Sequence, residues 1–128
     1  MTINKILAFD ALTCALMGVV LTLSAGALAP LLALPHVLLF YAGCVLFPIA
    51  IFMAVLARQD RPWAAGVWLV IVGNAAWVLA SIAVLLLTDP NMLGVSFLAA
   101  QAIVVAVLAL AEFKAVGQAS DAAPARAR

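Results

Sequence analysis

The sequence has few charged residues. Only 9% of its 128 residues are Asp, Glu, Lys or Arg, whereas soluble domains contain about a quarter. Hydrophobic residues make up 70% of the chain, and its mean hydropathy is +1.33. So much apolar surface excludes a water-soluble domain, and disorder is excluded because it needs low hydrophobicity. The net charge of +1 lacks the clustered Lys and Arg of a nucleic-acid-binding surface. We therefore predict an integral membrane protein whose partner is the lipid bilayer and not nucleic acid.

Residues that build metal and catalytic sites are also scarce. His36 is the only histidine, which excludes haem held by two histidines of one chain, and a zinc site would need several His or Cys ligands. Cys14 and Cys44 do not form a Cys-x-x-Cys pair, and their predicted depths differ by ~10 Å, too far for a disulfide. No glycine-rich phosphate loop or serine elbow is present. We expect no enzyme activity, no cofactor and no metal.

Stretches without charge predict the membrane spans. Residues 11–57 contain no Asp, Glu, Lys or Arg, and 47 residues of helix would measure ~70 Å, against a bilayer core of ~30 Å. This stretch must therefore hold two helices, with a break bracketed by Pro30 and Pro35. Residues 62–88 and 90–111 each hold one further span. The predicted helices lie near residues 6–29, 36–57, 63–88 and 92–114.

A signal peptide is the alternative interpretation of the first span. Lys5 supplies the positive start, and residues 27–29 (ALA) resemble a cleavage site. However, the apolar run is too long for a signal core, Asp10 interrupts its beginning, and Pro30 would follow the cut. We therefore expect a helix that is retained.

The basic residues predict the orientation. The connections at 30–35 and 89–91 contain no Lys or Arg, and all six basic residues fall on the other side, which is expected to be cytoplasmic. The predicted fold is an all-α, four-helix transmembrane bundle of the cell inner membrane, with both termini in the cytoplasm (N-in/C-in). The bundle covers residues 1–117, and residues 118–128 are predicted to form a disordered cytoplasmic tail. The six basic residues are Lys5, Arg58, Arg61, Lys114, Arg126 and Arg128.

Polar residues inside the third and fourth spans are candidates for a site. Asn74, Trp77 and Ser81 lie on one side of the third span. Pairing the two spans about their turn puts Gln101 level with Trp77 and Ser81, and Asn74 one turn away within its reach. Membrane helices associate through small residues and cross-helix hydrogen bonds. These four residues therefore either hold the helices together or line a substrate path.

Two acids, Asp10 and Glu112, lie near the predicted cytoplasmic ends of the first and fourth spans, where their carboxyl groups could meet at one depth. Acids within membrane spans are functional by default. The alternative is that Lys5 and Lys114 neutralise them close to the aqueous surface. The sequence leaves both interpretations open.

Part of the sequence resembles a group of short, functionally uncharacterised four-span proteins of proteobacteria. The resemblance lies in residues 67–70 (VWLV), 74–81 (NAAWVLAS) and 98–102 (LAAQA), and implies the same architecture but no activity, cofactor or catalytic residue. Small multidrug exporters are similar only in size and span count. The glutamate that they carry in the middle of their first helix has no match here, because residues 14–18 are neutral.

Three functions remain open from the sequence. The first, which we expect, is a non-enzymatic accessory or interaction subunit, as a homodimer or within a larger membrane complex. The second is a small-molecule transporter or exporter that uses Asn74 and Gln101 in the middle of the membrane. The third and most distant is a membrane enzyme.

Overall fold

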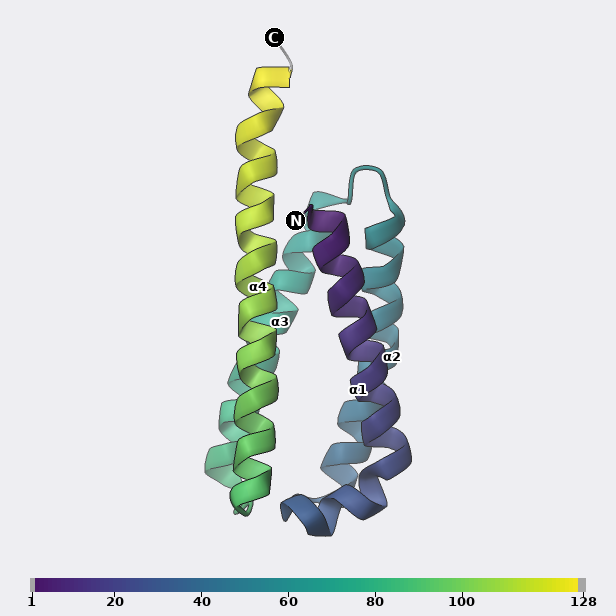
Figure 1. The fold of residues 1–128 in the computed structure, drawn as a ribbon, viewed down its shortest axis with the longest axis vertical. Coiled ribbons are helices and arrows are strands. Elements are labelled where there is room, and N and C mark those ends of the chain that lie inside the picture. Colours follow the sequence, from purple (N-terminus) through teal and green to yellow (C-terminus); the bar gives the residue numbers. More distant parts are fainter. Residues whose placement is uncertain (1, 127–128) are drawn as a thin grey trace.

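The chain folds into four helices arranged as two antiparallel hairpins (Figure 1). A computed structural model describes residues 2–126, with side chains described for residues 2–118. Within these residues, each helix is long and apolar enough to cross a membrane, which confirms the predicted all-α architecture of four candidate spans. The helices are α1 (Ile3–Leu32), α2 (His36–Arg58), α3 (Ala64–Leu87) and α4 (Met92–Arg126).

α1 continues past its predicted end. The prediction treated Pro30 as part of the break, but the structure has Pro30 inside the helix. A proline removes one hydrogen bond, here to the carbonyl group of Gly26, and bends a helix without necessarily ending it. The last turns of α1 accordingly lie across the end of the bundle (Figure 1). The helix ends at Ala33, whose φ of 54° is left-handed and whose backbone N–H bonds the carbonyl group of Ala29.

α4 is longer than predicted. It was expected to end near residue 114, with a disordered tail over residues 118–128, whereas the helix continues to Arg126. Residues 115–126 contain five alanines, and alanine has the highest intrinsic helix propensity, so a polar composition alone was a poor indicator of disorder. Residues 127 and 128 lie outside the described part of the chain.

α1 and α2 pack more extensively than any other pair of helices, and two glycines allow them to approach closely. A Cβ atom on Gly43 would lie 2.8 Å from the Cβ of Leu21, closer than real Cβ atoms approach. A Cβ atom on Gly18 would lie 3.2 Å from the carbonyl oxygen of Gly43. Small residues at membrane helix interfaces let two backbones approach closely. Lipid provides no hydrophobic driving force for helix association, so close packing of this kind stabilises the pair instead.

The contacts between the two hairpins are distributed unevenly among the helices. α1 packs against α4, but α2 and α3 barely touch. At the end of the bundle where α1 stops, the Asn91 side-chain amide donates to the carbonyl group of Leu31 at 2.8 Å, and its backbone N–H donates to that of Leu32. A Cβ atom on Gly94 would overlap the Leu32 carbonyl oxygen, so α4 begins directly against the end of α1. The hairpins are thus tied at this end, and they meet again near the start of α1, where Leu7 and Ala11 pack in one buried cluster with Val67 and Val70 of α3.

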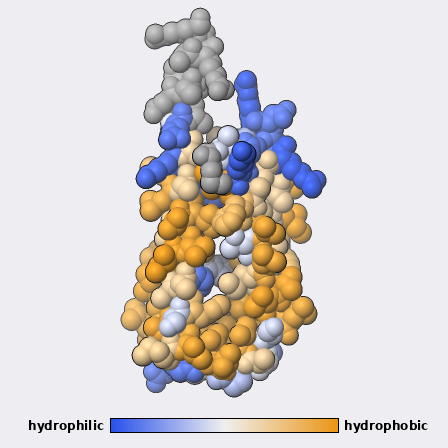
Figure 2. Space-filling model, in the orientation of Figure 1, coloured by the Kyte–Doolittle hydropathy of each residue, from blue (hydrophilic) through white to orange (hydrophobic). Residues whose placement is uncertain are grey.

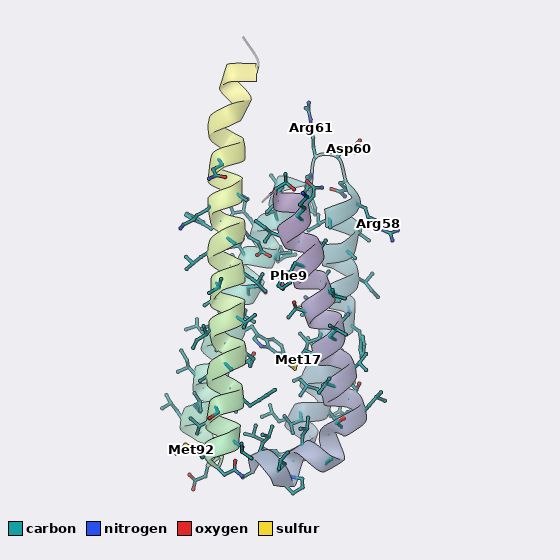
Figure 3. The ribbon with its side chains drawn as sticks, viewed as in Figure 1. Phe9, Met17, Arg58, Asp60, Arg61 and Met92 are labelled. Atoms are coloured by element: carbon teal, nitrogen blue, oxygen red, sulfur yellow. The ribbon has the colours of Figure 1, made fainter. Side chains whose placement is uncertain are left out.

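The outer surface of the helices is largely apolar. Large apolar side chains are exposed along the helices; Leu23 is 82% exposed and Leu87 is 84% exposed. Apolar residues cover most of the face seen in Figure 2, and hydrophilic residues gather at its ends. Arg58, Asp60 and Arg61 lie at one end and Met92 lies at the other (Figure 3). Four helices long and apolar enough to span a bilayer, with this surface, are compatible with a membrane protein.

Candidate functional site

A buried polar cluster joins three helices from both hairpins. The side-chain amide of Asn74 on α3 donates one hydrogen bond to Asp10 Oδ2 at 2.8 Å and another to Glu112 Oε2 at 3.1 Å. Asp10 belongs to α1 and is 1% exposed, and Glu112 belongs to α4 and is 0% exposed. The structure therefore brings the two candidate acids together and adds Asn74 as the bridge between them. We call Asp10, Asn74 and Glu112 the acid cluster.

The acid cluster contains no positive charge. Lys5 and Lys114, which the sequence analysis considered as neutralising partners, are both exposed while the two acids are buried. Besides Asn74, Asp10 accepts a weak hydrogen bond from the Cys14 thiol, with 3.7 Å between Sγ and Oδ1. Among the residues with described side chains, Glu112 Oε1 is the one buried side-chain oxygen or nitrogen without a hydrogen-bond partner. An ionised, uncompensated carboxylate costs several kcal/mol to bury, so the cluster must hold a proton or take up a cation.

A second polar group lies one to two turns farther along α3. The indole N–H of Trp77 donates to Gln101 Oε1 at 2.7 Å, and the amide of Gln101 donates to Ser81 Oγ at 2.6 Å. The Ser81 hydroxyl donates in turn to the backbone carbonyl group of Trp77 at 2.8 Å. The predicted level of Gln101 opposite Trp77 and Ser81 agrees with these contacts. The predicted reach of Asn74 to Gln101 is wrong, because the Asn74 amide bonds the two carboxyl groups, which are stronger acceptors than an amide oxygen.

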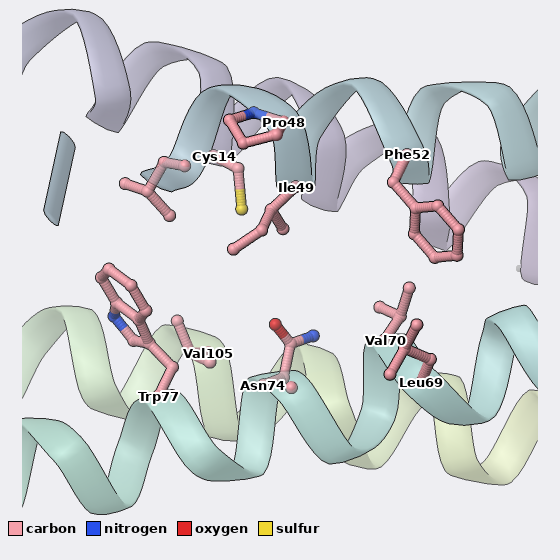
Figure 4. Close-up of a pocket in the computed structure, with 11 residues that line it drawn as sticks. Cys14, Pro48, Ile49, Phe52, Leu69, Val70, Asn74, Trp77 and Val105 are labelled. Carbon is pink, nitrogen blue, oxygen red and sulfur yellow. The ribbon is translucent and has the colours of Figure 1, made fainter. Parts of the chain in front are cut away.

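The separation of α2 from α3 leaves a cavity of about 390 Å³. Figure 4 shows Pro48, Ile49 and Phe52 of α2 on one side of it, facing Asn74 and Trp77 of α3 on the other. The Asn74 side chain points into this space from the α3 side (Figure 4). The other lining residues are mostly apolar: Cys14, Leu46, Leu69, Val70, Gly73 and Val105.

Two more cavities lie beside the first and share lining residues with it. One, of about 280 Å³, lies between α1 and α4 and is lined by Asp10, Met17 and Gln101 among others. The space-filling view is hollowed on this side, with polar atoms visible inside (Figure 2). The other, of about 180 Å³, extends toward the far end of the bundle, where Leu34 lines it. Trp77 lines all three cavities. An apolar cavity with a few polar groups is the common form of a small-molecule site.

One contributor to the site, Cys14, was not identified from the sequence. It was considered there only as a partner in a disulfide, although its spacing of four from Asp10 puts both on one face of α1 and could have indicated their contact. Trp77 was a candidate for packing or for lining a substrate path, but its place at three cavities depends on how far apart the hairpins stand, which no local pattern encodes. Within the described residues, no group of three or more His, Cys, Asp or Glu side chains could hold a metal ion.

No protein-family model, curated protein or solved structure matches this chain. The function must therefore be argued from the cavities and the two polar groups beside them.

Proposed function

We propose that this protein is a small, non-enzymatic carrier that binds a largely apolar molecule between its two hairpins. Its position would be the cell inner membrane with both termini in the cytoplasm, as the one-sided distribution of Lys and Arg favours. A reporter fused at residue 90 should then be exported. The observation that carries the proposal is the set of three cavities that share Trp77 as a lining residue.

The size of the cavities supports a small ligand. An engineered apolar cavity of ~150 Å³ in another protein is large enough to bind benzene. The cavity between α2 and α3 measures about 390 Å³, which is enough for a molecule with one or two rings and a short chain. Because α2 and α3 barely touch, a molecule dissolved in the bilayer can enter between them without first crossing water.

The position of Trp77 supports transport as well as binding. The cavity lined by Asp10 lies on one side of the indole ring, and the cavity lined by Leu34 lies on the other. Gln101 holds the ring by accepting its N–H. A molecule moves from one cavity to the other when the ring swings away, so Trp77 acts as the barrier and Gln101 fixes its closed position. Gating by a single element of this kind is a common way to control access.

The experiment is purification in native lipid particles followed by mass spectrometry of the bound small molecules and proteins. The matched variants are Gly73→Leu and Gly26→Leu, because a Cβ atom at either position meets nothing within 4 Å but only Gly73 lines one of the three cavities. We expect about one bound small molecule per chain in the wild type and in Gly26→Leu. We expect Gly73→Leu to have lost this molecule.

The same experiment distinguishes the accessory-subunit interpretation. A partner protein at fixed stoichiometry, with no small molecule depleted by Gly73→Leu, would contradict the carrier and support an interaction subunit. A second copy of this chain as the only partner, with the cavities holding nothing, would support a structural homodimer.

A further inference from the structure

We propose that the molecule carried is an amine, and that the acid cluster takes up its ammonium group in exchange for a proton. The inference rests on the proposed carrier function and names the substrate class. Its basis is the position of Asp10 and Asn74 at the cavity walls, with Glu112 held behind Asn74 by a hydrogen bond. A second observation is that the buried Oε1 of Glu112 has no hydrogen-bond partner among the residues with described side chains.

The acceptors of the acid cluster match the donors of an ammonium group. Asp10 lines the cavity between α1 and α4, and Asn74 lines the cavity between α2 and α3. Both N–H donors of Asn74 are used on the two carboxyl groups, so its remaining capacity is its carbonyl oxygen. Glu112 contributes Oε1, which has no partner. A primary ammonium group has three N–H donors and no acceptor, so its hydrogen-bonding groups are the complement of these oxygens.

Within residues 2–118, whose side chains the structure describes, no side chain supplies that positive charge to the acid cluster. α1 presents the Cys14 thiol to Asp10, and its Lys5 is exposed. α4 carries Lys114 two residues beyond Glu112, but this side chain is also exposed. α2 ends in Arg58, exposed at the same end of the bundle, and α3 presents only the neutral amide of Asn74. The acid cluster therefore faces the cavities with acceptors and no cation of its own.

The exchange conserves charge. In the empty protein, one carboxyl group of the pair stays protonated, because two uncompensated carboxylates cannot both be buried so close together. When an ammonium group arrives, the O–H bond of that carboxylic acid breaks, its electron pair stays on the oxygen, and the proton leaves to water. One positive charge enters and one leaves, so the buried site keeps its net charge and no other reactant is needed.

The test compares two probes that differ only in the polar group, 4-phenylbutylamine and 4-phenylbutanol. Binding to the purified protein at pH 7 is measured by titration calorimetry in two buffers of different ionisation enthalpy, which counts the protons released. We expect the amine to bind at least about ten-fold more tightly than the alcohol, a difference of about 1.4 kcal/mol, and to release about one proton per chain.

The variants are Glu112→Gln and Asp10→Asn, alone and together, which preserve side-chain shape but replace the ionisable carboxyl group with a neutral amide. Each should reduce the preference for the amine about ten-fold, and the double variant should release no proton. Binding of the alcohol shows that each variant is still folded. Asp60→Asn is the control, because Asp60 is an exposed acid in the connection between α2 and α3 and should behave as wild type.

The outcomes separate the inference from the carrier proposal. If both probes bind equally and no proton is released, the acid cluster does not select amines, although the cavity binds small molecules. If neither probe binds, both the inference and the carrier proposal fail. An amine preference that survives in the double variant would also contradict the inference.

Discussion

The interface within the first hairpin and the interface between the hairpins are built by opposite means. α1 and α2 approach until the backbones touch, at Gly18 and Gly43, and leave no room for a methyl group. The hairpins meet through the hydrogen bond from Asn74 to Asp10 and through those of Asn91 at the end of α1, and they enclose cavities between these contacts. Helix association in a membrane depends on packing and polar contacts, and here the two contributions are separated in space. The close packing of the first interface stabilises the fold, whereas the cavities at the second are the basis of the proposed ligand site.

The largest expected effect comes from overfilling the closely packed interface. Gly43→Leu places a side chain where even a Cβ atom lies 2.9 Å from the backbone nitrogen of Thr22, so the helices must separate. We expect a loss of about 1–3 kcal/mol or more in the free energy of unfolding. Gly73→Leu adds the same side chain where nothing lies within 4 Å and should change the stability little. Unfolding in detergent measures both, and equal losses would mean that the two interfaces do not differ.

The next effect concerns the acid cluster. Asn74→Leu leaves two buried carboxyl groups without their donor, which should cost about 1–3 kcal/mol of stability. Replacing Asp10, Asn74 and Glu112 together by Leu removes the unpaired groups as well, and should recover part of the loss. The same unfolding measurement applies. A triple variant less stable than Asn74→Leu would show that the acid cluster stabilises the fold. It would contradict the view that the cluster lowers stability and is kept for binding.

A smaller effect is expected for the second polar group. Gln101→Leu unpairs the Trp77 indole N–H and removes the hydrogen bond that Ser81 Oγ accepts, and membrane hydrogen bonds of this kind average ~0.6 kcal/mol. Since Asn74 and Gln101 have different partners, the losses from Asn74→Leu and Gln101→Leu should add to within about 0.5 kcal/mol. A double-mutant cycle measures this, with Trp77→Phe and Gln101→Leu as the pair that should show coupling. Strong coupling between Asn74 and Gln101 would contradict the separation of the two groups.

The smallest effect is expected for the cysteines, which are free in the structure. Cys44 lies on α2 next to Gly43, which contacts Leu21 and Thr22 of α1, about two turns from Cys14. Oxidation without a catalyst should therefore leave both thiols unpaired. Gel mobility with and without reductant checks this, and a Cys14–Cys44 bond would mean that the register of α1 against α2 is different.

The fold could largely be predicted from the sequence, because the cost of burying charge in lipid limits where spans can begin and end. Arg58, Asp60 and Arg61 mark the connection between α2 and α3 in this way. The sequence could not show whether Pro30 lies inside the first helix or after it. A proline can bend or end a helix, depending on whether the next residues make tertiary contacts. α4 beyond residue 114 was missed because alanine propensity outweighs the polar residues around it.

The sequence predicted which residues form the candidate site but not which of them form hydrogen bonds with one another. Asp10, Asn74, Gln101 and Glu112 stood out as polar residues in apolar spans. Their partners depend on which helix of one hairpin faces which helix of the other. Periodicity gives the face of one helix at a time, so Asn74 could be put near Gln101 on the neighbouring helix but not near Asp10, which is 64 residues away.

The most direct test of a ligand site between the hairpins is the binding of neutral 4-phenylbutanol to the wild type, Gly73→Leu and Gly26→Leu. The wild type and Gly26→Leu should bind with the same Kd, and Gly73→Leu should bind at least about ten-fold more weakly with an unchanged free energy of unfolding, because its side chain occupies the cavity. If Gly73→Leu binds the probe as tightly as the wild type, the cavity between the hairpins is not the site.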